Sequence, residues 1–254
     1  LHNDGARGVL VSGDQSTALV INGPDHVHIR TLTAGLQPQP AWTRVNKLDD
    51  LLRSSLDYAF REPLGFLTAS LWLVGTGLRA EAVLHLPALT LEKSILTLEH
   101  DLRRRGHVLD GVFGSIRNAP GEFYRLMNGI TLGKTEDELL LAFSQTVRDV
   151  VFRERTAREK LLAEARLSLE DRVGRAVGLA GGVRLLDFEE ALGLLSSIRL
   201  GVSSGLLDKC TLETCNTLLM QIKPAHIDVG FGSASDELTR NKKRAELFRA
   251  HFTS

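Results

Sequence analysis

Basic side chains gather near the end of the chain at a spacing that suits anion chemistry. Arg240 and Arg244 are four residues apart, so on a helix they share one face and can together hold a phosphate group through charged hydrogen bonds. A second interpretation makes the same segment the solvated basic end of a helix. The spacing alone leaves both interpretations open.

Two further pairs consist of residue types that bind metals or form disulfides. His26 and His28 fall on one face of a strand, but zinc needs further ligands and the sequence around them has no cysteine or histidine cluster. Cys210 and Cys215 lie five apart in a predicted helix, so their side chains should point in different directions and suit neither a disulfide nor a metal pair. We therefore expect no metal site and a reducing, cytoplasmic location.

The composition is that of an ordinary globular protein. Of 254 residues, 43% are hydrophobic and 24% are charged, and 31 basic residues balance 31 acidic ones. No overall charge therefore draws the chain to nucleic acid or to an anionic membrane. The sequence has no run of about 18 apolar residues and no secretion signal. It begins with Leu1 rather than methionine, and we expect a segment upstream of it.

The elements that position these residues follow from hydrophobic periodicity. The apolar runs 9–11 and 18–21 flank a polar turn and predict a β-hairpin. Apolar residues at helical spacing between Trp42 and Phe60 predict an amphipathic helix with one buried stripe.

A nearly continuous apolar run follows this helix. Residues 65–74 predict a central strand that leads into a glycine-rich turn at 75–77. Trp72, within the run, and Trp42 are both expected in the core.

The middle of the chain alternates helical and extended patterns. A helix is predicted from Pro87 to a stop at Gly106, followed by strands at 107–113 and 123–132. The capping box Thr135-x-x-Glu138 predicts the start of a long helix. Because no regular βαβ unit occurs, we predict an α+β fold in which helices flank an antiparallel sheet.

The pattern changes after about residue 163 to helices separated by glycines. These breaks are predicted at 178–182, Gly201 and Gly205. We predict two domains, a catalytic-type domain over 1–163 and a helical C-terminal region with a basic tail over 164–254.

Several separated segments, in order, resemble the ATP:guanidino phosphotransferases, and the later ones resemble the bacterial protein-arginine kinases in particular. Creatine and free-arginine kinases lack the C-terminal region that these later segments represent. The segments are 25–26, 74–80, 85–89, 130–134, 169–173 and 198–201. The resemblance implies an antiparallel sheet flanked by helices, binding of ATP with Mg²⁺, and transfer of the γ-phosphoryl group to a guanidinium.

The resemblance also implies roles for individual residues. Arg79, with its neighbour Ala80, matches the position that contacts ATP phosphate, and a surface arginine in a first helical turn is the alternative. Gly111 and Gly114 match a nucleotide loop, although glycines of ordinary turns look the same. His28 stands where the family has an arginine and can carry only a pH-dependent charge.

Other family positions carry different residue types here. Pro24 stands at the catalytic carboxylate, and Ser70 at the reactive thiol, where a hydroxyl stays protonated at neutral pH. Asn118 stands at a second carboxylate and cannot act as a base. Asp110 replaces an arginine and should repel phosphate. No catalytic residue is intact on this comparison, and Asp25 is the possible substitute.

The basic tail and a further upstream segment complete the resemblance. Residues 240–245 resemble the Arg-Asp-x-x-Arg-Ala motif that binds phosphoarginine in these kinases, with Asn241 in place of the aspartate. The phosphate-binding Ser-Ser-Arg-x-Arg strand of the family is expected upstream of Leu1.

Three functional hypotheses follow. The first is a protein-arginine-kinase-like domain with an eroded active site, which works as a regulatory form that binds nucleotide or phosphoarginine. The second is an active protein-arginine kinase in which Asp25 or Glu81 acts as base and His26 or His28 assists. The third is an interaction domain without small ligands.

Partners are implied by the resemblance alone. They are a protein substrate or a protein that carries phosphoarginine, a zinc-binding activator, a transcriptional repressor, a Clp-type protease and a second copy of the chain. Neither nucleic acid nor membrane is expected.

Overall fold

The chain divides into two compact units in a computed structural model that describes residues 6–230, 232 and 236–252. Unit 1 comprises Leu1–Ala82, Asp101–Val108 and Leu126–Asp149, and unit 2 comprises Val83–His100, Leu109–Arg125 and Val150–Ser254. Leu1, on which the prediction of an upstream segment rests, lies outside the described residues. The predicted domain boundary after residue 163 falls at the end of a helix and stays a prediction.

An antiparallel sheet begins unit 1. It consists of β1 (Gly8–Val11), β2 (Thr17–Ile21) and β3 (Val27–Thr31) in the order β1-β2-β3. Val20 of β2 pairs with both Val9 of β1 and His28 of β3. The predicted hairpin is confirmed, and it gains a third strand.

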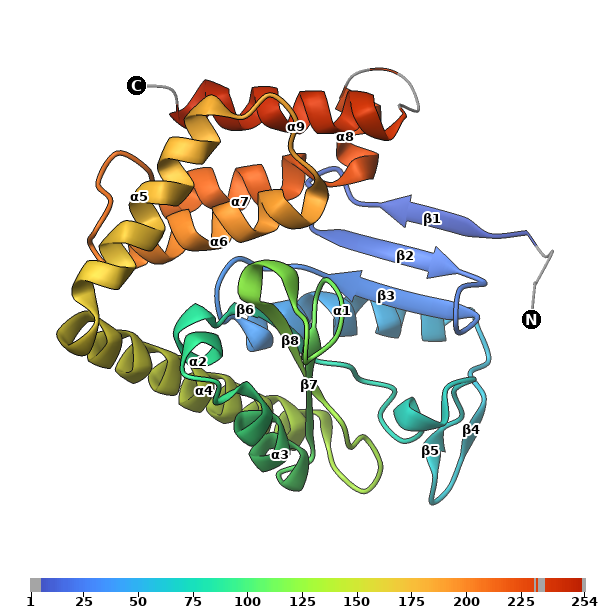
Figure 1. The fold of residues 1–254 in the computed structure, drawn as a ribbon. Helices are drawn as coiled ribbons and strands as arrows, with labels where there is room; N and C mark the ends of the chain where they lie inside the picture. The colour runs from blue at the N-terminus through green and yellow to red at the C-terminus, as the bar shows by residue number, and fades with distance from the viewer. Residues whose placement is uncertain (1–5, 231, 233–235, 253–254) are drawn as a thin grey trace. The chain divides into compact units, whose positions relative to one another are not determined.

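Helix α1 (Pro38–Arg53) packs against β3 (Figure 1). Its bounds differ from the predicted 42–60. Proline in the first turn suits the start of a helix, because its missing N–H would be unpaired there. At the other end, the Ser54 hydroxyl donates to the Leu51 carbonyl at 2.6 Å, an alternative bond that competes with helix continuation.

The prediction of a central strand over 65–74 is wrong. Only β5 (Gly65–Phe66) is extended, pairing with β4 (Phe60–Arg61), and Leu71–Leu73 form a 3-10 turn, η1. Trp72 is 82% exposed, so its expected place in the core is also wrong.

Residues distant in sequence impose the turn. The Thr131 hydroxyl donates to the carbonyls of Trp72 and Val74 at 3.0 and 2.8 Å. Gly75 has a φ of 116°, and a Cβ there would lie 2.5 Å from the Thr131 carbonyl oxygen. The backbone therefore follows Thr131 rather than a sheet ladder, and only glycine fits at position 75.

A second sheet has strands β6 (Glu81–His85), β7 (His107–Gly111) and β8 (Phe123–Asn128) in the order β6-β8-β7. Each strand begins in one unit and ends in the other. The strand predicted over 123–132 corresponds to β8, which ends at Asn128. The predicted helix from Pro87 is divided into α2 (Pro87–Leu91) and α3 (Ile95–Arg104), with Lys93 at a φ of 59° between them.

The capping box at the start of α4 (Glu136–Glu164) is confirmed. The Glu138 carboxylate accepts from the Thr135 amide at 2.8 Å, and the Thr135 hydroxyl accepts from the Glu138 amide at 3.3 Å. The predicted α+β class with antiparallel strands is confirmed as well.

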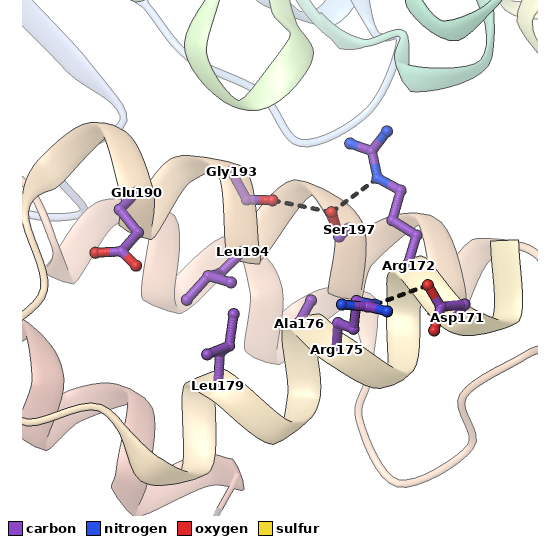
Figure 2. A pocket seen from close by; sticks show the side chains of 9 residues that line it. All are labelled: Asp171, Arg172, Arg175, Ala176, Leu179, Glu190, Gly193, Leu194 and Ser197. Carbon is purple, nitrogen blue, oxygen red and sulfur yellow. Dashed lines mark hydrogen bonds and ion pairs between the residues drawn. The ribbon is translucent and has the colours of Figure 1, made fainter. Parts of the chain in front are cut away.

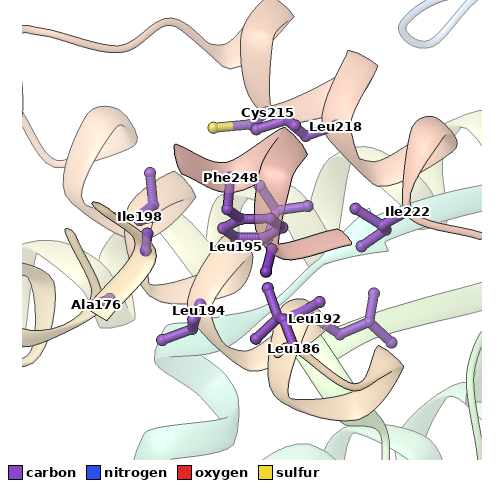
Figure 3. Close-up of a cluster of buried hydrophobic side chains, with 13 residues drawn as sticks. Ala176, Leu186, Leu192, Leu194, Leu195, Ile198, Cys215, Leu218, Ile222 and Phe248 are labelled. Atoms are coloured by element: carbon purple, nitrogen blue, oxygen red, sulfur yellow. The ribbon is translucent and has the colours of Figure 1, made fainter. Parts of the chain in front are cut away.

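Unit 2 ends in the predicted helical region. The helices are α5 (Arg166–Gly182), α6 (Phe188–Ser203), α7 (Leu212–Gln221), α8 (Pro224–Gly230) and α9 (Glu237–Phe252). Leu195 and Ile198 of α6, Leu218 of α7 and Phe248 of α9 meet in one buried cluster (Figure 3). Each such side chain contributes about 1.5–3 kcal/mol on burial.

The predicted break at 178–182 coincides with the end of α5 at Gly182, and the predicted break at Gly205 follows the end of α6 at Ser203. The predicted break at Gly201 is wrong, because Gly201 lies inside α6. A Cβ at Gly201 would lie 2.6 Å from Val173 Cγ1 of α5. Gly201 therefore permits close packing of the two helices rather than ending one.

The prediction that Cys210 and Cys215 share a helix and point in different directions is wrong. Cys210 precedes α7 rather than lying in it, because Thr211 is the N-cap and its hydroxyl accepts from the Thr214 amide at 3.1 Å. The chain turns at this point, and the Cys210 and Cys215 sulfurs are only 3.7 Å apart.

In the part of the chain that the structure describes, no helix combines the length and apolar character needed to cross a membrane.

A polar network within unit 2 centres on Glu122. The Glu122 carboxylate pairs with Arg172 at 2.7 Å and accepts from the Ser196 hydroxyl, which also contacts His85 Nε2 at 2.7 Å. Arg172 Nε donates to Ser197 at 2.9 Å. The network therefore joins β6 and the turn before β8 to α5 and α6.

The titration of His85 provides a test of this network. Burial, followed by the guanidinium groups of Arg199, Arg158 and Arg172, holds the pKa of His85 well below 6.5. The folded protein therefore keeps the ring neutral where the unfolded chain takes up a proton. The free energy of unfolding should fall as pH drops below 6.5, by up to about 1.4 kcal/mol per pH unit.

We expect His85→Gln to flatten this slope in urea denaturation between pH 7.5 and 5.5. Gln retains a polar partner for Ser196. The control is His100→Gln at an exposed position, which should retain the wild-type slope. Equal slopes in all three proteins would contradict the assignment.

Candidate functional site

Arg79 lies in the short segment that precedes β6, and the side chain of Asn128 fixes the backbone of this segment. Asn128 accepts from the Ala80 amide at 2.7 Å and donates to the Leu78 carbonyl at 3.0 Å. These bonds hold the residues on both sides of Arg79. The Arg79 Cα therefore has a defined position while its side chain remains partly free.

The Arg79 guanidinium is half-exposed and only weakly paired. Its Nη2 atom lies 2.5 Å from Met127 Sδ, and its Nε atom lies 3.9 Å from the Glu81 carboxylate. The side chains of Arg79 and Glu81 are 44% and 39% exposed. A pair this long and this solvated contributes little stability, so an anion can displace Glu81 at low cost.

Strand β3 places further basic side chains in the same unit. His28 and Arg30 are two residues apart and so share a face of β3. Burial, then the positive charges of Arg30 and Arg79, lower the pKa of His28, while Asp25 opposes them. His28 is therefore neutral at pH 7, and Arg30 carries the positive charge on this face.

Arg30 was not predicted as a site residue. The available signal was the two-residue period of the strand, which puts Arg30 on the same face as His28, the position where the resemblance predicts an arginine.

Asp25 links the turn before β3 to the loop that contains Ser70. Its Oδ1 atom accepts from the Ala69 amide at 2.5 Å. Pro24 and Ser70, the residues at the expected carboxylate and thiol positions, therefore lie on two segments joined by this bond. His26 is exposed and His28 half-buried.

The predicted nucleotide loop belongs to unit 2 and is closed on itself. Ser115 and Asn118 exchange backbone hydrogen bonds, both at 3.0 Å. Gly114 has a φ of 89°, and a Cβ on Gly111 would lie 2.8 Å from the Ser115 carbonyl oxygen. Packing within the loop thus accounts for both glycines. The amide of Gly111 is bonded to the Asp110 carboxylate at 2.8 Å, and the phosphate role of these glycines stays a prediction.

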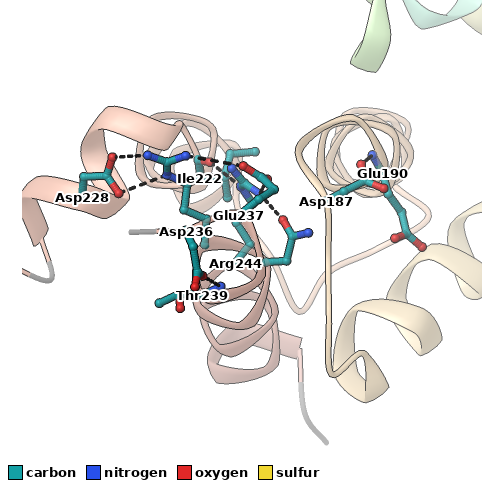
Figure 4. Close-up of polar contacts among 10 residues, drawn as sticks. Asp187, Glu190, Ile222, Asp228, Asp236, Glu237, Thr239 and Arg244 are labelled. Atoms are coloured by element: carbon teal, nitrogen blue, oxygen red, sulfur yellow. Dashed lines mark hydrogen bonds and ion pairs between the residues drawn. The ribbon is translucent and has the colours of Figure 1, made fainter. Parts of the chain in front are cut away.

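Arg240 of α9 is engaged in a two-point ion pair. Its Nε and Nη2 atoms donate to Asp228 at 3.1 and 2.7 Å, and Nη1 lies 3.5 Å from Glu237. Figure 4 labels both of these carboxylates. A phosphate on Arg240 would have to displace these carboxylates.

Arg244 is fully buried rather than on a solvated face. It donates to the Ile222 carbonyl at 2.9 Å, to Glu237 at 3.1 Å and to Asn241 at 2.5 Å, and its guanidinium lies 5.6 Å from the centre of the Phe188 ring. Both arginines of the predicted phosphoarginine site therefore carry structural contacts. Their binding role stays a prediction.

A pocket of about 520 Å³ lies between α5 and α6 (Figure 2). Its lining combines the charged side chains of Asp171, Arg175 and Glu190 with apolar Leu179 and Leu194. None of the site residues predicted from the sequence contributes to it.

The residues around Arg79 fit a nucleoside triphosphate in their charge and in the type of hydrogen-bond donor that they supply. Arg79 and Arg30 are permanently charged donors, the type that binds phosphate through paired hydrogen bonds. Asp25 and Glu81 supply carboxylate oxygens, which can pair with a guanidinium or accept its proton. All four belong to unit 1.

Two family models match the chain. Residues 1–157 match the ATP:guanido phosphotransferase, C-terminal catalytic domain, and residues 166–254 match the Protein-arginine kinase McsB C-terminal domain.

Full-length relatives agree with these matches. The protein-arginine kinase of Symbiobacterium thermophilum is 39% identical over 98% of this chain and 70% of its own length. That of Syntrophomonas wolfei is 38% identical over 96% of this chain and 68% of its own length.

A solved structure supports the fold. The duplicated taurocyamine kinase from Schistosoma mansoni, with bound transition state analog components, superposes with a TM-score of 0.58 at 22% identity. The match covers 68% of this chain and 25% of that one.

The backbone clamp on Arg79 can be tested by removing its side chain. We expect Asn128→Ala to lower the free energy of unfolding by about 1–3 kcal/mol, because the Ala80 amide loses its partner in a partly buried place. Urea denaturation measures the change. Asn46→Ala, which removes only an exposed bond to Asp50, is the control, and an equal loss in both variants would contradict a specific clamp.

Proposed function

The chain belongs to the protein-arginine kinase family of ATP:guanido phosphotransferases, and on that premise we propose that it transfers the γ-phosphoryl group of ATP to arginine side chains of proteins. The supporting observation is the charge arrangement of unit 1. The guanidinium groups of Arg30 and Arg79 lower the pKa of His28, and the carboxylate of Asp25 raises it. Phosphoryl transfer to a guanidinium needs both signs of charge close together.

The basic residues would bind the phosphate oxygens. When bound, ATP supplies the phosphoryl group and Mg²⁺ neutralises part of its charge. Arg79 is half-exposed and keeps its backbone clamped by Asn128, so it can reach an anion without a change of fold. Arg30 occupies the same strand face as His28 and replaces the charge that a histidine lacks at neutral pH.

Asp25 is the proposed proton acceptor. Its Oδ1 atom is held by the Ala69 amide, and Oδ2 takes a proton from the substrate guanidinium. The freed nitrogen then forms a bond to the γ-phosphorus as the bond to the ADP oxygen breaks, and ADP leaves with the electron pair. Glu81, 3.9 Å from Arg79, orients the second edge of the substrate guanidinium.

A second candidate function is a regulatory form that binds ligands without transfer. Pro24, Ser70 and Asn118 favour it, because none of these side chains can act as a base or supply a thiolate. In this alternative the cluster of Arg79, Arg30, Asp25 and Glu81 (the Arg79 cluster) binds nucleotide, and the basic motif of α9 binds phosphoarginine on a partner protein.

We further propose, from family membership, a cytoplasmic homodimer that works with a zinc-binding activator and a Clp-type protease.

Substitution of Asp25 separates the two functions. The full-length gene product, incubated with ATP, Mg²⁺ and an arginine-containing protein, should form acid-labile phosphoarginine detectable by mass spectrometry. Asp25→Asn should lower the rate by about 10²–10⁴-fold, the usual effect of losing a general base. Asp57→Asn, an exposed carboxylate in the same unit, should leave the rate unchanged.

An unchanged rate in Asp25→Asn would exclude Asp25 as the base. Absence of phosphoarginine in every protein, together with intact nucleotide binding, would favour the regulatory form.

Nucleotide binding is tested by calorimetry with ATP and Mg²⁺. We expect Arg79→Ala and Arg30→Ala each to weaken binding by about 10–100-fold, because each removes a charged hydrogen-bond donor worth about 1.5–3 kcal/mol. Arg61→Ala, at an exposed position of β4, is the control. Equal affinity in all three variants would rule out a nucleotide site at Arg79 for both functions.

A further inference from the structure

The two cysteines of the chain form a close thiol pair. Their sulfurs are 3.7 Å apart, and Cys210 Sγ is also 3.5 Å from the Thr211 carbonyl oxygen. The turn that Thr211 makes as the N-cap of α7 brings the Cys210 side chain back over the first turn of the helix. A disulfide requires a sulfur separation of about 2.05 Å, so a short approach of the two side chains would close it.

The two thiols differ in exposure. Cys215 is buried in the cluster that contains Leu218 and Phe248 (Figure 3), whereas Cys210 is partly exposed. Burial, followed by the neighbouring Cys210, raises the pKa of Cys215 to about 12. Cys210 is therefore the thiol that a reagent in solution meets first.

A positive charge also lies beside the buried thiol. Arg199 of α6 donates to Asn216 at 2.6 Å, and its guanidinium acts on Cys215 in the direction that favours the thiolate. The sulfur can thus lose its proton as it reacts, although it stays protonated at rest.

We propose that Cys210 and Cys215 form an oxidation site that closes to an intramolecular disulfide on reaction with low-molecular-weight disulfides, such as oxidised glutathione. A metal site is a poorer match, because structural zinc takes four ligands and the described residues contain no group of three or more His, Cys, Asp or Glu side chains placed for a metal.

The chemistry proceeds by two exchanges. The Cys210 thiolate attacks one sulfur of the small disulfide, whose S–S bond breaks, and one small thiol leaves with the electron pair and takes up a proton. Cys215 then attacks the Cys210 sulfur and releases the second small thiol, which receives the Cys215 proton. The protein loses two electrons and two protons, and the small disulfide gains them.

The proposed bond would tie the α6–α7 connection to α7. Cys210 lies on that connection and Cys215 in the helix, so closure restrains the chain beside the buried cluster. A cross-link of this kind restricts the unfolded chain, and we expect a higher thermal midpoint for the oxidised protein.

The test uses the full-length protein and oxidised glutathione, followed by alkylation and mass spectrometry of the intact chain and of the peptide spanning residues 210–215. We expect a loss of mass equal to two hydrogen atoms, no alkylation of either thiol, and full reversal by dithiothreitol. Cys215→Ala should instead accumulate a glutathione adduct on Cys210, because the resolving thiol is absent. Cys210→Ser should resist both modifications.

Two results would overturn the proposal. One is a wild-type protein in which both thiols remain alkylatable after incubation with excess oxidised glutathione. The other is a stable glutathione adduct on the wild-type protein in place of the internal disulfide. The wild-type measurement is decisive even if a variant fails to fold, and it is independent of kinase activity.

Discussion

The pairing of the largely buried Glu122 carboxylate is a constraint on which several elements of unit 2 depend. A charge with 15% of its side chain exposed must be paired, and Arg172 and Ser196 supply its partners. Glu122 reaches them only because it and Gly121 adopt φ values of 53° and 76°. At Gly121 a Cβ would lie 3.1 Å from Leu192 of α6. The same backbone conformation at Gly121 and Glu122 therefore brings the turn close to α6 and places the Glu122 carboxylate beside its partners.

The Arg79 cluster is arranged by a different principle. Its charges remain partly solvated, and the fixed part is the backbone, which Asn128 holds on both sides of Arg79. A solvated guanidinium costs little to keep unpaired, so it stays available to an anion. Burial has the opposite effect on His28, whose lowered pKa removes its charge at neutral pH. Arg30 is then the group that can supply permanent charge on this strand face.

Local patterns in the sequence correctly predicted the elements that are stabilised by contacts between residues close in the sequence. The capping box of Thr135 and Glu138 and the hairpin of β1 and β2 need only neighbouring residues, and both were correct. The strand predicted over 65–74 does not form, because hydrogen bonds from Thr131, which is distant in the sequence, set the backbone conformation there. The same limit applies to the site. The family resemblance made Arg79 and Asp25 candidate site residues, but no sequence pattern could reveal that the Ala69 amide holds the Asp25 carboxylate.

The basic motif of α9 illustrates why spacing alone does not assign a ligand. Arg240 and Arg244 share a helical spacing that suits phosphate, yet Arg244 is completely buried, and both arginines pair with Glu237. A buried guanidinium without a partner would cost several kcal/mol, so these contacts are a condition of folding. A phosphoryl group must therefore compete with a carboxylate already in place. Glu237 is 61% exposed, and this exposure makes it the partner that can move aside, whereas Asp228 holds Arg240 at two points. Any phosphoarginine binding here would thus proceed by exchange of one anion for another.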